Sequence, residues 1–293
     1  MIKFEGIIPA LVTPLTEDER INTKVLHKLI KDLTLKGADG FYIGGATGEG
    51  LKLRTEERMI LAEESLKAIG GKVPSIVQVA SMNFNDAILL AKHANKIGAD
   101  AISATPPLFF QYDEDDVYNY YKALAEASSL PVMIYYSAAA GFYMRPEFAA
   151  RVFEIDNVTA IKWTNPNFYE LNKLKFLTNG EMNIINGPDE MLLMGLSAGA
   201  DGGIGSTYNF MFETIKSIYE CFKKGDIKEA QKFQTKANRI ISVLLKYEGI
   251  PVTKVIMEAM GYEVGNAAFP MKRYTDEEKK VILSDFKTAG LEI

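Results

Sequence analysis

A single lysine carries the clearest chemical signal in the sequence. In the stretch "VTAIKWT" (residues 158–164), the apolar residues before Lys162 are typical of a buried β-strand. Burial of an ammonium group is costly, and apolar surroundings favour the neutral amine. A neutral lysine amine can attack a carbonyl carbon and form a Schiff base. The other interpretation is a lysine whose stem packs on the core while its charged head reaches solvent.

Two tyrosines at the end of the preceding apolar run could assist the same chemistry. The run "VMIYYS" (residues 132–137) contains Tyr135 and Tyr136, and a phenol can transfer protons. A protonated imine is itself an electron sink, so this reaction requires neither a metal nor an organic cofactor. The two histidines, His27 and His93, fall in the patterns of surface helices and predict no metal site.

A glycine-rich turn, "GGATGEG" (residues 44–50), could bind a small anion. Its glycines let backbone N–H groups approach an anion, and Thr47 adds a hydroxyl group. The turn lacks the lysine of a nucleotide-binding P-loop, which argues against a nucleotide ligand. The alternative is a tight turn that needs glycine for its geometry alone.

These stretches belong to a regular alternation of short apolar runs and longer amphipathic segments. Each run is followed by a segment with the apolar spacing of a helix. Three helix–strand junctions read Gly-Ala-Asp (residues 37–39, 98–100 and 199–201), where the glycine suits a left-handed helix cap. The eight runs predicted as strands are "GIIPALV", "GFYIGG", "SIVQVAS", "AISATPP", "VMIYYS", "TAIKWT", "NIINGP" and "GGIGS".

Eight strand–helix units predict an α/β fold, a (β/α)8 TIM barrel with its active site at the carboxyl ends of the strands. A doubly wound open sheet is the alternative, but no Gly-x-Gly-x-x-Gly motif follows the first run. The barrel would comprise residues 1–224. Residues 225–293 have a purely helical pattern and predict a C-terminal helical extension of the same domain unit, since no linker precedes them.

The composition excludes several classes of partner. The chain has 293 residues, of which 47% are hydrophobic, and a formal net charge of -5. It has no basic stripe, so we expect no nucleic-acid partner, and no segment approaches a membrane span. The one cysteine, Cys221, supports neither a disulfide framework nor a zinc site and fits a reducing compartment. We therefore expect a soluble cytoplasmic protein.

Several motifs together resemble a known family. "GGATGEG", "LPVMIYY", "AIKWT", "NGPDE" and "AGADGGIGSTYN" are similar to the N-acetylneuraminate lyase and dihydrodipicolinate synthase family of pyruvate-dependent class I aldolases. The similarity spans nearly the whole chain, and the last two motifs resemble the lyase branch more than the synthase branch. The resemblance implies a (β/α)8 barrel with C-terminal helices, a homotetramer, and a covalent lysine–pyruvate imine in place of any cofactor.

The resemblance also assigns roles to individual residues. Lys162 matches the lysine that forms the imine, and Tyr135 matches the tyrosine that relays protons. Thr47 and the amide region of Gly48 match the pocket for the pyruvate carboxylate. The residues that match positions holding the polyhydroxy chain of a sialic acid are Thr164, Gly187, Asp189, Glu190 and Ser206.

Two positions depart from the family pattern. Ala46 stands where the family has a serine or threonine whose hydroxyl joins the proton relay. The pair Phe109-Phe110 stands where the family has two tyrosines, the second of which reaches across a dimer interface, and Tyr112 lies two positions away. The segment "YYSAAAG" (residues 135–141) is one residue shorter than its counterpart. Other hydroxyls that could replace the lost ones belong to Tyr136 and Tyr143.

The sequence therefore predicts a carbon–carbon lyase whose partner is a small-molecule 2-keto acid. The leading interpretation is reversible cleavage of a 2-keto sugar acid, namely sialic acid, into pyruvate and N-acetylmannosamine. One alternative is a related aldolase or dehydratase acting on a 2-keto-3-deoxy sugar acid, or an enzyme like dihydrodipicolinate synthase. Another is a non-catalytic protein that binds a 2-keto acid, because Ala46 and Phe110 replace relay hydroxyls.

Overall fold

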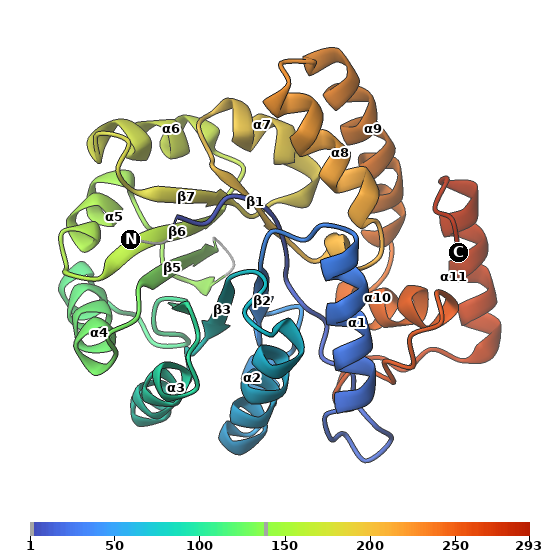
Figure 1. Cartoon of the computed structure of the whole chain (residues 1–293), viewed down its shortest axis with the longest axis horizontal. Coiled ribbons are helices and arrows are strands. Elements are labelled where there is room, and N and C mark those ends of the chain that lie inside the picture. The colour runs from blue at the N-terminus through green and yellow to red at the C-terminus, as the bar shows by residue number, and fades with distance from the viewer. Residues whose placement is uncertain (1–2, 138–139) are drawn as a thin grey trace.

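Eight parallel strands form one sheet that curls into a barrel in the computed structural model, which describes residues 3–137 and 140–293 (Figure 1). The strand order is β1-β8-β7-β6-β5-β4-β3-β2. A parallel bridge between Ala10 and Tyr42 brings β1 back to β2 and confirms the predicted barrel. The strands are β1 (Gly6–Pro9), β2 (Phe41–Ile43), β3 (Ser75–Gln78), β4 (Ala101–Ala104), β5 (Val132–Ser137), β6 (Val158–Thr164), β7 (Asn183–Asn186) and β8 (Gly202–Gly205).

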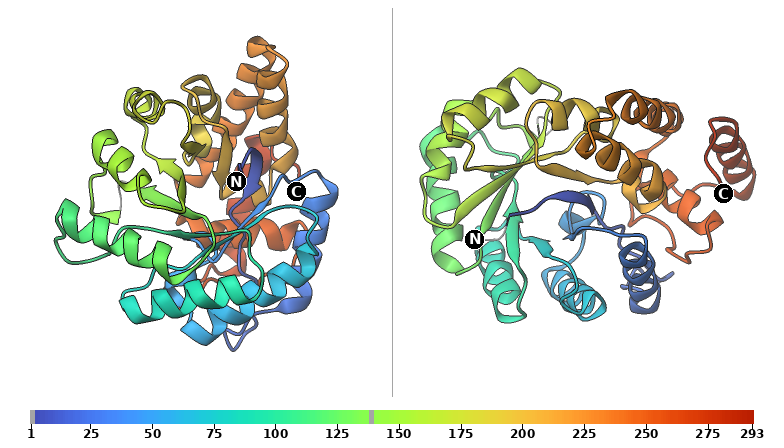
Figure 2. Two further views of the ribbon diagram at one scale, coloured as in Figure 1. Left: turned by 60° about the vertical axis from the view of Figure 1, so that its left-hand side comes forward. Right: turned by 45° about the horizontal axis from the view of Figure 1, so that its top comes forward.

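A helix follows each strand and covers the outside of the barrel (Figures 1 and 2). The eight helices are α1 (Thr23–Leu35), α2 (Thr55–Ile69), α3 (Phe84–Lys96), α4 (Glu114–Ala127), α5 (Pro146–Phe153), α6 (Phe168–Leu177), α7 (Leu192–Ser197) and α8 (Phe212–Lys223). Three further helices follow them: α9 (Ile227–Leu244), α10 (Gly249–Ala259) and α11 (Asp276–Thr288). Among the described residues, no helix has both the length and the apolar character needed to cross a membrane.

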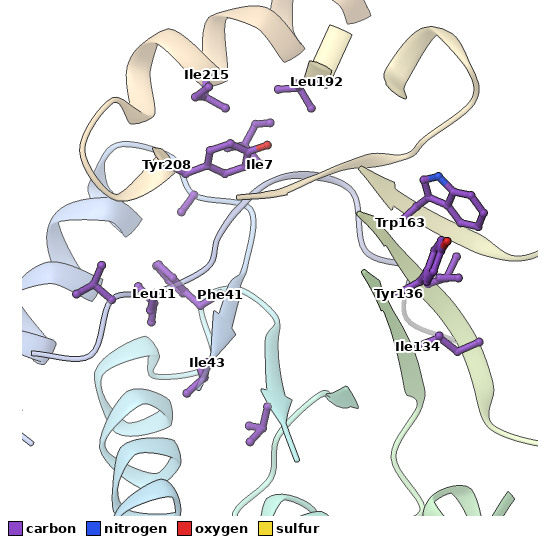
Figure 3. Packing of buried hydrophobic residues seen from close by; sticks show 14 of the residues in the cluster. Ile7, Leu11, Phe41, Ile43, Ile134, Tyr136, Trp163, Leu192, Tyr208 and Ile215 are labelled. Carbon is purple, nitrogen blue, oxygen red and sulfur yellow. The ribbon is translucent and has the colours of Figure 1, made fainter. Parts of the chain in front are cut away.

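The strands are buried on both faces, and successive side chains alternate between two layers. In β5, Tyr135 faces the inside of the barrel and Tyr136 faces the surrounding helices. Figure 3 shows Tyr136 and Trp163 packed together in the outer layer. The inner layer consists of Phe4, Ile8, Ala10, Tyr42, Ile76, Ala101, Met133, Tyr135, Ala160, Ile185 and Ile204.

The three Gly-Ala-Asp turns fasten the amino-terminal ends of the strands. Their glycines have φ angles of 92°, 80° and 108°, the left-handed conformation that the sequence predicted. Each aspartate accepts the backbone N–H of the first or second residue of a neighbouring strand. The nitrogen–oxygen distances are 2.7 Å from Ile7 to Asp39, 2.8 Å from Ser75 to Asp100 and 3.0 Å from Ile184 to Asp201.

Replacing Asp100 with alanine should lower the free energy of unfolding by about 1–3 kcal/mol, because the buried N–H of Ser75 loses its acceptor. The matched control is Glu258→Ala, which removes an exposed ion pair with Lys279 and should cost no more than about 0.5 kcal/mol. Urea unfolding followed by circular dichroism measures both changes. Equal effects of the two substitutions would show that Asp100 does not anchor the strand.

Candidate active site

The register between β5 and β6 places Lys162 beside Tyr135. The pairing shifts by one residue near the start of these strands, where Val132 pairs with Val158 but Met133 pairs with Ala160. Without this bulge, Lys162 would lie opposite Tyr136 and would face away from Tyr135. Because of it, Lys162 and Tyr135 are direct neighbours on the inner face of the barrel.

The amine of Lys162 lies close to two aromatic rings. The side chain is 6% exposed, and its Nζ lies 4.2 Å from the ring centroid of Tyr135 and 5.2 Å from that of Tyr42. None of the ion pairs between described residues includes this lysine. A buried cation is stabilised by the faces of aromatic rings, and a buried amine without a carboxylate partner is available for chemistry.

Tyr42 is a member of the site that the motifs did not reveal. Its hydroxyl donates to Ser103 Oγ at 3.0 Å, and Ser103 in turn donates to the carbonyl of Met133 at 2.9 Å. Burial raises the pKa of Tyr42 far above its ordinary value, so its hydroxyl stays protonated. Strand alternation is the signal that finds Tyr42, since Phe41 and Ile43 on either side pack in the outer layer.

The other two tyrosines considered from the sequence lie elsewhere. Tyr136 packs against Trp163 outside the barrel and accepts a hydrogen bond from Asn165 Nδ2 at 2.9 Å. The hypothesis that Tyr136 supplies a missing hydroxyl is therefore wrong, because strand alternation turns it away from Lys162. Tyr143 is mostly exposed and donates to Glu170, a hydrogen bond that raises the pKa of Tyr143 to about 12.

Asp189 lies at the rim formed by the ends of β7 and β8. Its Oδ2 accepts from the backbone N–H of Thr207 at 2.9 Å, from the Thr207 hydroxyl at 2.7 Å and from Ser206 Oγ at 3.4 Å. Burial raises the pKa of Asp189, although the bonds from Thr207 and the charge of Lys162 act in the opposite direction. Its Oδ1 is buried and has no partner among the described residues. Thr207 was not among the residues selected from the sequence.

A second buried oxygen without a partner belongs to Thr164, the last residue of β6. Its Oγ1 is bonded to no described residue, and a Cβ atom at Gly187 would collide with it. Gly187 is therefore needed for Thr164 to hold its place beside β7. Buried polar oxygens are almost always hydrogen-bonded in proteins, so the unpaired oxygens of Thr164 and Asp189 mark this rim as a candidate binding site. Glu190, the neighbour of Asp189, is exposed at the same rim.

The glycine-rich loop begins at Gly44, directly after Ile43, the last residue of β2. Its backbone is folded tightly against the segment that follows β1: Thr13 Oγ1 donates to the carbonyl of Gly48 at 2.6 Å, and a Cβ at Gly48 would lie 2.9 Å from the carbonyl of Leu11. Within residues 3–137 and 140–293, the amides of Thr47 and Gly48 have no acceptor. These two N–H groups remain candidates for binding an anion.

The two phenylalanines of the β4 loop project from the surface. Phe109 is 85% exposed and Phe110 is 66% exposed, and their rings meet edge to face. Phe110 also packs edge to face on Tyr112, with ring centroids 6.4 Å apart. Phenylalanine has no hydroxyl group, so neither ring can supply one to a proton relay. The shortened segment after β5 lies partly outside the described residues, since it includes Ala138 and Ala139.

Each of the two histidines, the residues that most commonly ligate metals, contacts a glutamate. His27 contacts Glu64 at 3.0 Å and His93 contacts Glu63 at 2.9 Å, so both histidines bind glutamates of α2 on the barrel's outside. In the part of the chain that the structure describes, no group of three or more His, Cys, Asp or Glu side chains is placed to hold a metal ion.

Comparisons with known proteins agree on one family. Residues 3–289 match the "Dihydrodipicolinate synthetase family". The N-acetylneuraminate lyase of Rhizobium meliloti is 33% identical over 94% of this chain and 92% of its own length. Among solved structures, an N-acetylneuraminate lyase from Proteus mirabilis has a TM-score of 0.95 at 31% identity and covers 99% of this chain and 100% of its own. A dihydrodipicolinate synthase from Bacillus anthracis has a TM-score of 0.93 at 26% identity, with coverage of 98% and 99%.

The buried carboxylate of Asp189 leads to a prediction about stability. Asp189→Asn should raise the free energy of unfolding at neutral pH by roughly 1 kcal/mol, because asparagine still accepts from Thr207 but buries no charge. The pKa of Asp189 is raised by folding, so its charge opposes folding above the ordinary aspartate pKa and not below it. The gain should therefore shrink as the pH falls toward about 4.

The control for this prediction is Asp201→Asn. Burial raises the pKa of Asp201, but its ion pair with Lys3 and its bond from Asn183 outweigh this and hold the pKa below the ordinary value. Asp201→Asn should therefore lose stability at neutral pH. Urea unfolding of both variants across the acid range measures the two trends. A loss of stability in Asp189→Asn as well would contradict the charge argument.

Proposed function

Because the chain belongs to the dihydrodipicolinate synthetase family, a family of class I aldolases, we propose that it cleaves a 2-keto sugar acid through an imine on Lys162. The chain is a carbon–carbon lyase. The observation that carries the proposal is the buried amine of Lys162, which has no carboxylate partner among the described residues and lies against the ring of Tyr135.

The chemistry follows from these two residues. The neutral amine of Lys162 attacks the keto carbon, water leaves, and a protonated imine remains. The electron pair of the bond between the third and fourth carbons then moves toward the imine nitrogen and gives an enamine. Tyr135, having given its phenol proton to the departing water, takes as a phenolate the proton of the hydroxyl on the fourth carbon, which becomes the aldehyde. Tyr135 returns this proton to the enamine carbon, and hydrolysis of the imine releases pyruvate and the free lysine.

The rest of the pocket would hold the two ends of the substrate. We assign the pyruvate carboxylate to the unpaired amides of Thr47 and Gly48. The unpaired oxygens of Thr164 and Asp189, at a rim that also carries Gly187, Glu190 and Ser206, suit a ligand with several hydroxyl groups. Sialic acid is such a ligand, and it would give pyruvate and N-acetylmannosamine. The relatives named N-acetylneuraminate lyase support this assignment.

Two other functions fit parts of the site. A related aldolase or dehydratase, or an enzyme like dihydrodipicolinate synthase, would use the same lysine with another 2-keto acid, and the Bacillus anthracis structure supports it. A non-catalytic binding protein would keep the carboxylate loop, and the absence of hydroxyls at Ala46 and Phe110 supports it. Product formation from a panel of 2-keto sugar acids separates these functions, since a pure binding protein turns over none of them.

The assembly that we propose is a homotetramer in the cytoplasm. Support for contact between subunits comes from a surface beside the β4 loop, where Met82, Phe84, Leu108 and Tyr112 are among the residues that line a cavity of about 310 Å³. Phe110 packs on Tyr112 at its edge and is largely exposed. Exposed apolar surface of this kind is typical of contacts between subunits.

Incubation with pyruvate and borohydride should attach one reduced pyruvate to Lys162, because borohydride fixes an imine as a stable secondary amine. Peptide mass spectrometry identifies the modified residue. Lys254 provides an internal control, since it is equally buried but pairs with Glu49 and should stay unmodified. An adduct at another lysine, or none at all, would contradict the imine proposal.

The double substitution Ala46→Ser and Phe110→Tyr should raise the rate of sialic acid cleavage by roughly tenfold or more, because positioned acid–base groups contribute about 10²–10⁴-fold. The rate is measured from pyruvate released in a coupled assay. The matched control is Phe109→Tyr, which adds a hydroxyl to the neighbouring exposed ring and should change nothing. An unchanged rate in the double variant would show that the missing relay does not limit cleavage.

A further inference from the structure

A buried ion pair joins the glycine-rich loop to the C-terminal helices. Glu49 Oε1, in the loop, lies 2.8 Å from Lys254 Nζ, in the middle of α10. The side chains of Glu49 and Lys254 are 0% and 2% exposed. In every other ion pair among the described residues, at least one side chain is more than 15% exposed. This ion pair therefore links α10, which lies outside the eight strand–helix units, to the end of the loop.

The segment after α10 makes further bonds to the same loop. Glu49 Oε2 accepts the backbone N–H of Ala268 at 2.7 Å, and Lys254 Nζ donates to the carbonyl of Asn266 at 3.0 Å. Lys52, just beyond the loop, donates to the carbonyls of Ala268 and Phe269 at 3.1 and 3.2 Å. The loop and residues 266–269 thus form one hydrogen-bonded unit with the ion pair at its centre.

The backbone of Glu49 is held in a conformation that a glutamate seldom adopts. Its φ and ψ angles are 56° and 24°, in the left-handed region that glycine occupies without strain. The residues on both sides, Gly48 and Gly50, are glycines, and yet the left-handed position itself is occupied by a glutamate. The carboxylate of Glu49 supplies the interactions that hold the strained backbone, and this backbone is adjacent to the free amides of Thr47 and Gly48.

The pair is also poorly suited to a purely stabilising role. Burial lowers the pKa of Lys254, and the carboxylate of Glu49 only partly offsets this effect. Apolar side chains of similar volume often stabilise a protein as well as a buried ion pair does, whereas removal of one partner leaves an unpaired buried charge. The pair adds fixed geometry instead, because the two charges lie 2.8 Å apart and the hydrogen bonds of Lys254 to Asn266 and of Ala268 to Glu49 fix the direction of each side chain.

We propose that Glu49 and Lys254 are positioning residues, whose ion pair fixes the amides of Thr47 and Gly48 in the geometry that binds the carboxylate of a 2-keto acid. This inference rests on the proposed function, because it takes that carboxylate as the ligand of the loop. It makes the C-terminal helices part of the active site, although none of their side chains needs to touch the substrate.

The test uses the full-length protein and four variants. Lys254→Met removes one charge, Glu49→Gln removes the other but keeps an acceptor for Ala268, and the third variant combines both changes. The matched control, Ile282→Ala, destabilises α11 without touching the loop. For each protein, borohydride trapping gives the half-saturating pyruvate concentration and the rate at saturation, and a thermal scan gives the melting temperature.

We expect Lys254→Met to raise the half-saturating pyruvate concentration roughly tenfold or more, while the saturated trapping rate changes less than about twofold. The double variant should melt above Lys254→Met, because no unpaired charge remains, and yet keep the raised half-saturation. Ile282→Ala should melt at a lower temperature with unchanged half-saturation. If Lys254→Met does not fold, the half-saturating pyruvate concentrations of Glu49→Gln and of the double variant test the proposal, and both should be raised.

Failure of the positioning proposal can be distinguished from failure of the imine proposal. Normal half-saturation in Glu49→Gln and in the variants lacking Lys254, with trapping intact, refutes the positioning role and leaves the imine chemistry standing. If the unmodified protein traps no pyruvate, the imine proposal fails, and titration calorimetry with pyruvate decides the positioning role. Binding that is weaker in Lys254→Met than in the unmodified protein supports this role, and equal binding or no binding refutes it.

Discussion

The candidate site depends on the register of two neighbouring strands. Side chains alternate between the inside and the outside of the barrel, so a shift of one residue in β5–β6 pairing exchanges every neighbour. The bulge near the start of these strands turns Lys162 toward Tyr135 and leaves Trp163 and Tyr136 to pack together under the helices. One extra residue therefore decides which phenol lies beside the amine. The other features of the site are arranged around that pair.

Buried charged groups lack a partner in one part of the pocket and are paired in another. Where bonds would be made and broken, polar groups are left open: Lys162 has no carboxylate partner, and one oxygen of Asp189 has no donor, among the described residues. Where the loop geometry must be fixed, the opposite charges of Glu49 and Lys254 are paired, 2.8 Å apart. Open buried groups reduce stability, and enzymes commonly accept this loss at the site of reaction.

The sequence predicts those parts of the molecule that depend on local patterns. The eight strands, the left-handed glycines of the Gly-Ala-Asp turns and the position of Lys162 in a buried strand all follow from runs of a few residues. The bulge does not, because it is a property of two paired strands. The pair of Glu49 with Lys254 joins residues about 200 positions apart, and no local pattern reveals such a contact. Residue type alone does not say which face of a strand a side chain occupies, so the sequence leaves Tyr136 as a possible proton donor although it faces the helices.

The two ends of the pocket are held by different physical means, and this bears on the missing relay hydroxyls. The amine end is fixed from within the barrel by the packing of Tyr42 and Tyr135, and the hydroxyl of Tyr42 is already bonded to Ser103. Tyr135 is then the phenol beside Lys162 that is left to move protons. The loop that we propose for the substrate carboxylate is fixed from outside by α10. Since neither support involves Ala46 or Phe110, the absence of hydroxyls at these two positions would slow the proposed proton transfer without disturbing the groups that we assign to binding the 2-keto acid.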